Sequence, residues 1–393
     1  MKRKIAVVTT SRADYSHLYW VLHELRSRPE VDLRVLATAA PLAWEFGATV
    51  AEMEADGFTI DERIECLLSS DTDVGMAKTI GVATLGLADA LGKMRPDMLL
   101  LIADRYELLA PAAVAVALRI PIAHVEGGEI SRGAIDDAVR NAVTKLSHLH
   151  FTPTGAARDR VLAMGEEAWR VHRTGAPSLD HLTKRELLDG RALAAALGVA
   201  LPPGFAVVAF HPLTLARDTL EEADAFFAAL EGLSLPVAFC FPNADAGSRA
   251  LVRRAGAYCA GRDNAALFVN LNPLVYWSLL SQARVMLGNS SSGIMETASL
   301  RLPTVNVGRR QQGRQRAANV IDAPAEPCAV LAAVEQALAE EFARSLVGLE
   351  NPYGDGHAAE RIADVLCGAP PAHVLLDKRP LPVGAGGFAQ DGG

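Results

Sequence analysis

Short apolar runs alternate with amphipathic stretches along the first half of the chain. The apolar runs, which are typical of buried strands, cover 4–10, 31–38, 98–103, 120–126, 148–153 and 170–175. Stretches with helical spacing lie between them, at 14–28, 40–56, 74–94, 105–119 and 134–147. Strands that alternate with helices in this way predict βαβ units and a parallel sheet.

The same pattern starts again in the second half, with apolar runs at 205–211, 236–242, 266–271, 285–288 and 303–308. A chain of 393 residues is also long for a single core. We therefore predict an α/β fold with two Rossmann-like, doubly wound domains. The first covers 1–176 and the second 177–368, with the last helix packing back on the first domain, and a flexible Gly/Pro-rich tail covers 369–393. Ligands bind beyond the carboxyl ends of the strands in such folds, so we expect the active site between the domains.

Charge and composition exclude several classes of protein. The net charge is -8 and the pI is about 5.7, which argues against a nucleic-acid partner. The N-terminal apolar run, Ile5 to Val8, is too short for a signal peptide, and no run approaches the roughly 18 apolar residues of a membrane span. The five cysteines are scattered without metal-type spacing. We expect a cytoplasmic protein with no membrane partner and no bound metal.

Two segments that follow predicted strands are suited to phosphate. The turn "TTSRADYSHL" contains no glycine, so the dinucleotide fingerprint is absent, and the chain has no P-loop motif. Arg12 in this turn can reach a phosphate, although an ion pair with Asp14 is the alternative. In "GNSSSG", we predict a helix that starts after Asn289 or Ser290 as its N-cap and binds an anion. Capping alone would also explain these serines.

Three carboxylates occur where predicted strands end or a helix begins: Asp104, Glu126 and Asp136. Asp104 and Glu126 are at strand ends, the usual place for catalytic groups in this architecture. The ordinary alternatives are an N-cap for Asp104 and surface ion pairs of Asp136 or Asp137 with Arg140.

Histidines give one further candidate. His211 ends the first strand of the second half, where it can transfer a proton or bind phosphate, although a packed strand-end histidine is the alternative. We expect His124 to be a hydrogen-bonded strand residue. His148 and His150 alternate on one strand and suit a core or an interface better than a metal site.

Several of these segments together resemble the hydrolysing UDP-N-acetylglucosamine 2-epimerases of the sialic-acid and legionaminic-acid pathways. The matching segments lie in order between residues 11 and 362: "SRADYSHL", "DRYELL", "HVEGGEISRGAIDDAVRNAVTKLSHLHF", "TGAPSLD", "HPLT", "GNSSSGIMETASLRLPTVNVGRRQQGR" and "NPYGDGHAAERI". The long run that begins with "HVEGGE" is highly specific, whereas no single short motif is.

The resemblance implies the two-domain arrangement called GT-B and a set of site residues. It places Asp104, Glu126 and Asp136 on the catalytic carboxylates and His211 on the active-site histidine. The positions that it implies for nucleotide-sugar binding are Arg12, Ser290, Ser291, Ser292, Gly293 and Arg310 around the diphosphate, Glu296 at the nucleoside, and Asp137 and Arg140 beside the catalytic helix. Two departures are visible: Asn141, where the family often has His, and the segment "PLTLARD" after His211.

The implied reaction eliminates UDP from UDP-N-acetylglucosamine to give a 2-acetamidoglycal, which water then converts to N-acetylmannosamine. Asp104 and Glu126 would be the acid/base groups and Asp136 a stabiliser or water activator, with no cofactor. The same chemistry on UDP-2,4-diacetamido-2,4,6-trideoxyglucose or on a GDP-linked donor stays open. So do a non-hydrolysing 2-epimerase, a GT-B glycosyltransferase and a nucleotide-sugar-binding protein. The resemblance also suggests a homodimer or homotetramer.

Overall fold

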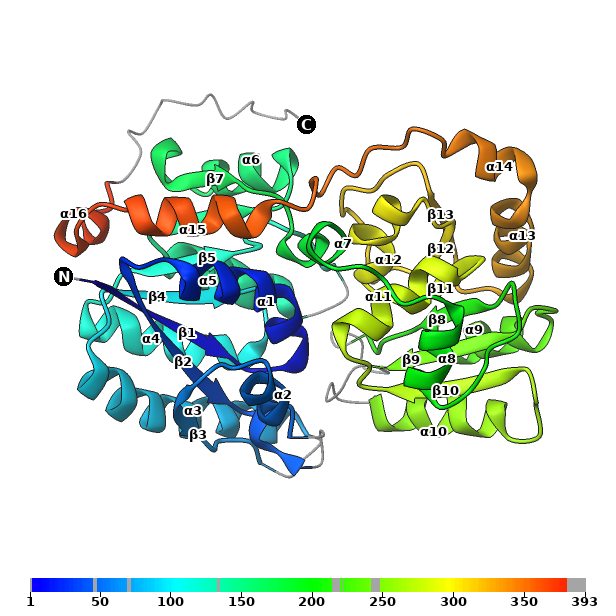
Figure 1. The fold of residues 1–393 in the computed structure, drawn as a ribbon, viewed down its shortest axis with the longest axis horizontal. Helices are drawn as coiled ribbons and strands as arrows, with labels where there is room; N and C mark the ends of the chain where they lie inside the picture. The colour runs from blue at the N-terminus through cyan, green and yellow to red at the C-terminus, as the bar shows by residue number, and fades with distance from the viewer. Residues whose placement is uncertain are drawn as a thin grey trace, which may run out of the picture.

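The computed structural model describes residues 2–44, 48–68, 72–132, 135–213, 220, 222–241 and 248–379. Within them the chain forms two open parallel sheets, each covered by helices (Figure 1). The predicted doubly wound architecture is therefore confirmed.

The first sheet has seven strands in the order β3-β2-β1-β4-β5-β6-β7. Their bounds are β1 Arg3–Thr9, β2 Val31–Thr38, β3 Ile60–Ile64, β4 Met98–Ile102, β5 Ile122–Val125, β6 Leu149–Thr152 and β7 Val171–Arg173. Six of them coincide with predicted runs. The sequence analysis missed β3, an edge strand whose "IDERI" sequence keeps only its two end residues buried.

The second sheet has six strands in the order β10-β9-β8-β11-β12-β13. Their bounds are β8 Ala206–Ala209, β9 Val237–Phe241, β10 Ala265–Val269, β11 Val285–Gly288, β12 Thr304–Val307 and β13 Val320–Ala323. Here the missed strand is β13, which is again at an edge and is mostly half-buried.

Helices connect the strands and cover both faces of each sheet. In the first half they are α1 Arg12–Ser27, α2 Val50–Ala55, α3 Asp73–Met94, α4 Leu109–Leu118, α5 Asp136–Leu146, α6 Gly155–Ala163 and α7 Asp180–Lys184. The others are α8 Gly190–Leu197, α9 Ala223–Glu231, α10 Ser248–Cys259, α11 Pro273–Gln282, α12 Ser292–Met295, α13 Pro327–Leu338, α14 Glu340–Ser345, α15 Ala358–Gly368 and α16 Ala372–Leu376. The predicted helix at 40–56 is reduced to α2 and the short 3₁₀ helix Ala40–Leu42, and 45–47 lie outside the described residues.

Alternation along the strands divides the core of the first half between the two faces of its sheet. In β4, Leu100 and Ile102 pack with α1, whereas Leu99 and Leu101 pack with α3 and α4. Because both faces are covered, these strands are continuously apolar, which is why the sequence revealed them.

Helix α3 is the one described helix that is long and apolar enough to cross a membrane, with a mean hydropathy of 1.3 over its best window. This is weak evidence, because core helices pass the same test. The buried face of α3, which includes Ala83, Leu87 and Leu91, belongs to the core of the first half.

The chain returns to the first half at its end, where α15 lies along α1 (Figure 1). Ile362 and Leu366 of α15 join the core that contains Leu18 and Leu22 of α1. The guanidinium of Arg3 donates to the carbonyl oxygens of Leu366 and Ala369, both at 2.5 Å. The predicted flexible tail covered 369–393, but this is wrong for 369–379, which contain α16 and pack on the first half. Residues 380–393 lie outside the described part of the chain.

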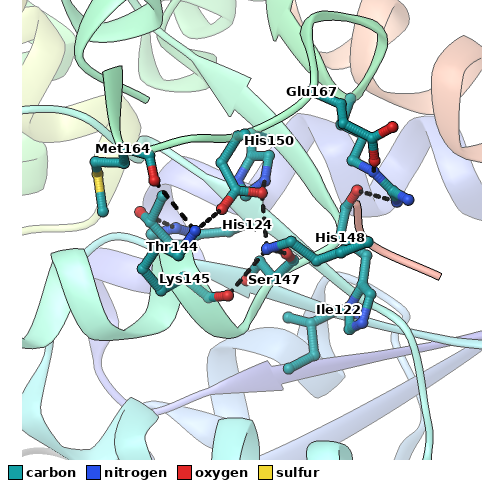
Figure 2. Close-up of polar contacts among 12 residues, drawn as sticks. Ile122, His124, Thr144, Lys145, Ser147, His148, His150, Met164 and Glu167 are labelled. Atoms are coloured by element: carbon teal, nitrogen blue, oxygen red, sulfur yellow. Dashed lines mark hydrogen bonds and ion pairs between the residues drawn. The ribbon is translucent and has the colours of Figure 1, made fainter. Parts of the chain in front are cut away.

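A buried charge network holds the segment that follows α16. The carboxylate of Glu166, which is fully buried, accepts from Lys145 Nζ at 2.7 Å and His150 Nε2 at 3.0 Å, and lies 2.7 Å from Lys378 Nζ. Figure 2 shows Lys145 and His150 within this network, with the interactions drawn as dashed lines. Arg170 adds hydrogen bonds to the carbonyl oxygens of Leu375 and Asp377, at 2.8 and 2.9 Å.

His148, just before β6, and His150, within it, are therefore structural. His150 is completely buried against Glu166, and His148 Nδ1 accepts from the backbone N–H of Ile122 at 3.0 Å. Burial lowers the pKa of His148 to about 4, so its ring is a neutral acceptor at pH 7. Among the described residues, no three His, Cys, Asp or Glu side chains form a possible metal site.

We expect Lys378→Met to destabilise the protein by about 1–3 kcal/mol, because it leaves a buried carboxylate with one charged partner fewer. Burial alone would raise the pKa of Glu166, but the hydrogen bonds from His150, Lys145 and Lys378 lower it to about 2. The stabilisation is thus fully present above the unfolded pKa of about 4.3 and is lost as the pH falls toward 2. Urea unfolding at several pH values measures the difference, which should shrink as the solution is acidified from pH 5 to pH 3.

The matched control is Arg379→Met, because the Arg379–Asp377 pair is more than two-thirds exposed on both sides. Its unfolding midpoint should stay at the wild-type value. An equal loss in the two variants would contradict the importance of the Glu166 network.

Candidate active site

The candidate site lies where the strand order of each sheet reverses. In the first sheet the reversal is between β1 and β4, and in the second it is between β8 and β11. Open α/β sheets bind ligands beyond the carboxyl ends of the strands at such points. The segments that leave these four strands carry Arg12, Asp104, His211 and Ser290.

A pocket of about 270 Å³ occupies this position and is lined from both halves of the chain. The first half contributes Arg12, His17 and Arg105. The second half contributes His211, Tyr276, Ser290, Ser291, Ser292, Glu296 and Arg310, together with apolar residues such as Phe241 and Phe268. Gly293 lies behind this wall, where an added Cβ would be 3.1 Å from Thr304 Cγ2.

The three predicted carboxylates do not line this pocket themselves. Glu126 Oε1 lies 2.9 Å from Nδ1 of the pocket residue His17, and Asp136 Oδ2 lies 3.9 Å from Nη2 of the pocket residue Arg310. Asp104 accepts a hydrogen bond from Arg140, and its neighbour Arg105 lines the pocket. Glu126 and Asp136 are thus one contact away from the pocket, whereas Asp104 is directed to the Arg140 side.

Arg140 organises the region between these carboxylates. Its buried guanidinium donates to Asp104, to Asp137 Oδ1 and the Glu129 carbonyl oxygen, both at 2.7 Å, and to Ser131 Oγ at 3.0 Å. Burial and the neighbouring arginines lower the pKa of Arg140. The predicted pair of Asp137 with Arg140 exists, but it is part of a buried network and not a solvated surface pair.

The Gly-Gly turn after β5 permits a close backbone approach. Gly128 has a φ of +80°, and a Cβ there would be 2.2 Å from the Ala157 carbonyl oxygen, so no larger residue fits. Glu126 itself has a φ of +64°, a strained conformation for a residue with a side chain. His124 supports the turn, with Nε2 2.8 Å from the Ala103 carbonyl oxygen and Nδ1 3.1 Å from Thr144 Oγ1. His124 is therefore the hydrogen-bonded strand histidine that the sequence predicted.

The serine segment differs from its prediction. Neither Asn289 nor Ser290 is an N-cap: helix α12 starts at Ser292, lasts one turn, and has Ser291 as its N-cap without a side-chain hydrogen bond. Asn289 is used elsewhere, since its Oδ1 accepts from the His211 N–H at 2.6 Å and its Nδ2 donates to the His211 carbonyl oxygen at 2.9 Å. A one-turn helix has a small dipole, so any anion here would depend on hydroxyl, N–H and guanidinium donors.

His211 is held in place by this backbone pairing. The side chain of Asn289 holds the His211 backbone, and the His211 side chain is mostly buried and faces the pocket. Most of the divergent segment "PLTLARD" that follows, from 214 on, lies outside the described residues.

The predicted alternative of an Arg12–Asp14 pair is wrong. Arg12 Nη2 instead donates to both carboxylate oxygens of Glu52, at 2.7 and 3.0 Å. Asp14 Oδ2 accepts from the N–H and hydroxyl of Thr10, at 2.9 and 2.6 Å. Among the described residues, Arg12 Nε has no hydrogen-bond partner. Burial lowers the pKa of Arg12, and Glu52 partly offsets this effect.

Sequence reasoning missed the residues that join the two halves beside the site. Arg314 Nε donates to the Ile130 carbonyl oxygen at 3.0 Å and lies 3.2 Å from Glu129 Oε2. The hydroxyl of Tyr353 donates to the same Glu129 oxygen at 3.2 Å. Glu129, Arg314 and Tyr353 lie within the quoted motifs "HVEGGE", "QQGR" and "NPYG". Their place in these motifs was the available signal.

Sequence comparison identifies the family of the chain. The sequence model of the UDP-N-acetylglucosamine 2-epimerase family matches residues 23–367. The chain belongs to the UDP-N-acetylglucosamine 2-epimerase family. The resemblance to the hydrolysing branch of this family is confirmed by two curated relatives that align with this chain over most of their own length.

Two relatives of this epimerase-family chain are named as hydrolysing enzymes. The Campylobacter jejuni GDP/UDP-N,N'-diacetylbacillosamine 2-epimerase is 36% identical over 324 residues, 82% of this chain and 84% of the relative. The Legionella pneumophila UDP-N,N'-diacetylbacillosamine 2-epimerase is 34% identical over 379 residues, 96% of this chain and 99% of the relative. The Escherichia coli polysialic acid biosynthesis protein P7 is 30% identical over 354 residues, 89% of this chain and 90% of the relative.

Two solved structures share the fold of this family member. The Neisseria meningitidis UDP-GlcNAc 2-epimerase, solved with UDP-GlcNAc bound, aligns with a TM-score of 0.78 at 19% identity, covering 92% of this chain and 99% of its own. Staphylococcus aureus MnaA, solved with UDP, aligns with a TM-score of 0.77 at 18% identity, covering 93% of this chain and 96% of its own. The GT-B-like, two-domain arrangement is thereby confirmed.

We expect Arg314→Met to destabilise this epimerase-family protein by about 3–5 kcal/mol at pH 8, because Glu129 would be buried without its guanidinium partner. Burial raises the pKa of Glu129, and Arg314 opposes this rise. A carboxyl whose pKa is raised in the folded state stabilises the protein at low pH, and this stabilisation is lost as the pH rises. The free energy of unfolding of the variant should therefore increase as the pH falls from 8 to 5.

Chemical unfolding at pH 5 and pH 8 measures this effect. Glu335→Gln, on the exposed face of α13, is the control and should leave stability unchanged at both pH values. A variant that is destabilised equally at the two pH values would show that packing, and not the Glu129 charge, is responsible.

Proposed function

We propose that the protein is a hydrolysing 2-epimerase that converts a UDP-linked 2-acetamido sugar to UDP and the free 2-epimer. The observation that carries the proposal is the pocket at the two switch points, which combines cations beside a Ser-rich segment with carboxylates at the adjacent strand ends. The names of the hydrolysing relatives support the same reaction.

The chemistry of C2 explains why both kinds of group are needed. The C2–H bond of the sugar is not acidic, so direct deprotonation is unreasonable. Departure of the diphosphate from C1 creates an oxocarbenium-like centre, which acidifies the neighbouring C2–H bond. A base then removes the proton and leaves a 2-acetamidoglycal, to which water adds at C1 and a proton at the opposite face of C2.

Arg12 and Arg310 are the proposed ligands of the departing diphosphate, together with Ser290, Ser291 and Ser292. All five line the pocket, and the Nε of Arg12 is an unused donor within the described residues. Cations and hydroxyls placed where negative charge develops stabilise that charge without reorganisation. Glu296, on the same wall, is the proposed acceptor for nucleoside hydroxyls, and His211 is proposed to contact the phosphates or the sugar.

Asp104 and Glu126 are the proposed acid/base pair and Asp136 the proposed stabiliser or water activator. Strand register supports a shared location for the first two, because Ile102 pairs with Val125, Glu126 follows Val125 directly, and Asp104 follows Ile102 after one intervening residue. Asp137 and Arg140 are proposed to position them through the hydrogen bonds described above. No step of this mechanism requires a metal or a redox cofactor.

NMR in D₂O tests the reaction, with UDP-N-acetylglucosamine and UDP-2,4-diacetamido-2,4,6-trideoxyglucose in separate samples and a GDP-linked donor in a third. Free nucleotide and a manno-configured sugar with deuterium at C2 would establish the hydrolysing epimerase and identify its donor. A UDP-linked 2-epimer would indicate a non-hydrolysing enzyme. Intact donor in every sample would contradict the proposed function and favour a glycosyltransferase or a binding protein.

We expect Asp104→Asn and Glu126→Gln to lower kcat by about 10²–10⁴-fold each, the usual contribution of a general acid or base. The rate of UDP release, measured in quenched samples taken over time, gives the loss of kcat. Asp159→Asn and Glu335→Gln, both at exposed helix positions, are the matched controls and should retain full activity. Near-normal activity in either site variant would remove that residue from the proposed mechanism.

We further propose a soluble cytoplasmic homodimer formed through α3, without excluding pairs of dimers. Val74, Val82 and Leu85 form one exposed apolar stripe on this helix, at 58%, 40% and 72% exposure. A second copy of the same surface would cover such a stripe and avoid its contact with water.

We expect Leu85→Glu to halve the mass measured by light scattering, because it places a charge in the proposed interface. Val347→Glu is the control, since Val347 is 76% exposed in the other half of the chain. A wild-type protein that is already monomeric at micromolar concentration would refute the dimer.

A further inference from the structure

His17 stands between two carboxylates that come from different halves of the chain. It is on α1, one turn after Arg12, and its Nδ1 lies 2.9 Å from Glu126 Oε1. Its Nε2 lies 4.0 Å from Glu296 Oε1, across the pocket. The ring is about one-fifth exposed, and that exposed part lines the pocket.

This geometry favours a charged imidazolium that donates to Glu126. Burial alone would lower the pKa of His17, but the charge and hydrogen bond of Glu126, with Glu296 and Asp14, raise it to about 9. For Glu126, burial alone would raise the pKa, and His17 with Arg314 outweighs burial and lowers it. The two groups therefore hold each other in their charged forms at pH 7.

We propose that His17 is a positioning residue whose Nδ1–H keeps the Glu126 carboxylate ionised and oriented for removal of the C2 proton. The inference rests on the proposed function. In the step concerned, Glu126 takes the C2 proton, the C–H electrons form the C1–C2 double bond, and the C1–O bond breaks as UDP leaves with its electron pair. A protonated Glu126 could not accept that proton, so the charge on His17 sets the fraction of active enzyme.

The groups that determine this titration come from several elements. The ionisable side chains whose charges act on His17 or Glu126 are Asp14 on α1, His124 at β5, Glu129, His181 on α7, Glu296 after α12, and Arg314. Apart from Glu129 and Arg314, each of them either is an acid that favours the imidazolium or is a histidine. Burial lowers the pKa of His124 and His181 to about 4, so these rings are neutral at pH 7 and do not compete for the charge.

His17→Gln tests the charge, because glutamine can still donate a hydrogen bond to Glu126 but cannot be protonated. We expect kcat at pH 7 to fall about tenfold, less than the 10²–10⁴-fold expected for loss of the base itself. The acidic limb of kcat against pH should move to higher pH, because the Glu126 carboxyl would lose the cation that lowers its pKa. KM should change little. Added imidazole should restore part of the activity of His17→Ala.

The control is His357→Gln, because the ring of His357 is half exposed at the start of α15. This variant should have the wild-type dependence of kcat on pH. A His17→Gln enzyme with the wild-type acidic limb would overturn the proposal. A uniform loss at every pH without rescue by imidazole would likewise assign His17 a purely structural role.

A measurement without substrate separates this inference from the proposed function. Ring ¹⁵N chemical shifts of His17 should show protonation up to about pH 9 in the wild type and a clearly lower pKa in Glu126→Gln. If no donor is converted but this coupling is observed, the proposed function fails and the ion pair stands. If the enzyme is active but His17 titrates near its ordinary value, the function stands and the proposal for His17 is wrong.

Discussion

Two buried guanidinium groups, Arg140 and Arg314, converge on the segment Glu129–Ser131, and the geometry of the site depends on them. Arg140 comes from the first half and Arg314 from the second, yet both bond to Ser131 Oγ. Backbone carbonyls of the segment accept from both as well. The turn that carries Glu126 is thus fixed only when the two halves of the chain are in contact.

This arrangement links folding to chemistry. Buried charges are tolerated only when each finds partners, and here the partners lie on the other half of the chain or on another strand end. Separation of the two halves would break the contacts of Arg314 and Tyr353 with Glu129. Asp104 in particular takes its position from Arg140, a residue outside the pocket lining.

The sequence revealed the parts of the fold that are buried on both faces. Strands such as β4 are continuous apolar runs, whereas the edge strands β3 and β13 carry polar residues and were missed. The prediction of the site is limited in the same way, because contacts between distant segments leave no local pattern.

Strand-end residues such as Asp104 and His211 were predictable from their position. The N-cap prediction at Asn289 failed because that side chain bonds across the sheet to His211, a contact between residues 78 positions apart. His17 was missed because a helix residue gives no local sign that a carboxylate from another strand faces it.

Solvent exposure separates the arginines of the site by role. Arg140 and Arg314 are almost fully buried and bond to backbone and carboxylate groups of the chain itself, so a ligand could displace them only at a large cost in free energy. Arg12 pairs with Glu52, whose side chain is 40% exposed and can return to water when a better anion arrives. An ion pair of this kind contributes little, so a diphosphate with two charges would replace it readily. The chain thus keeps Arg140 and Arg314 saturated and pairs Arg12, the proposed diphosphate ligand, with a partly exposed carboxylate, which is the distribution that the proposed site for a departing diphosphate requires.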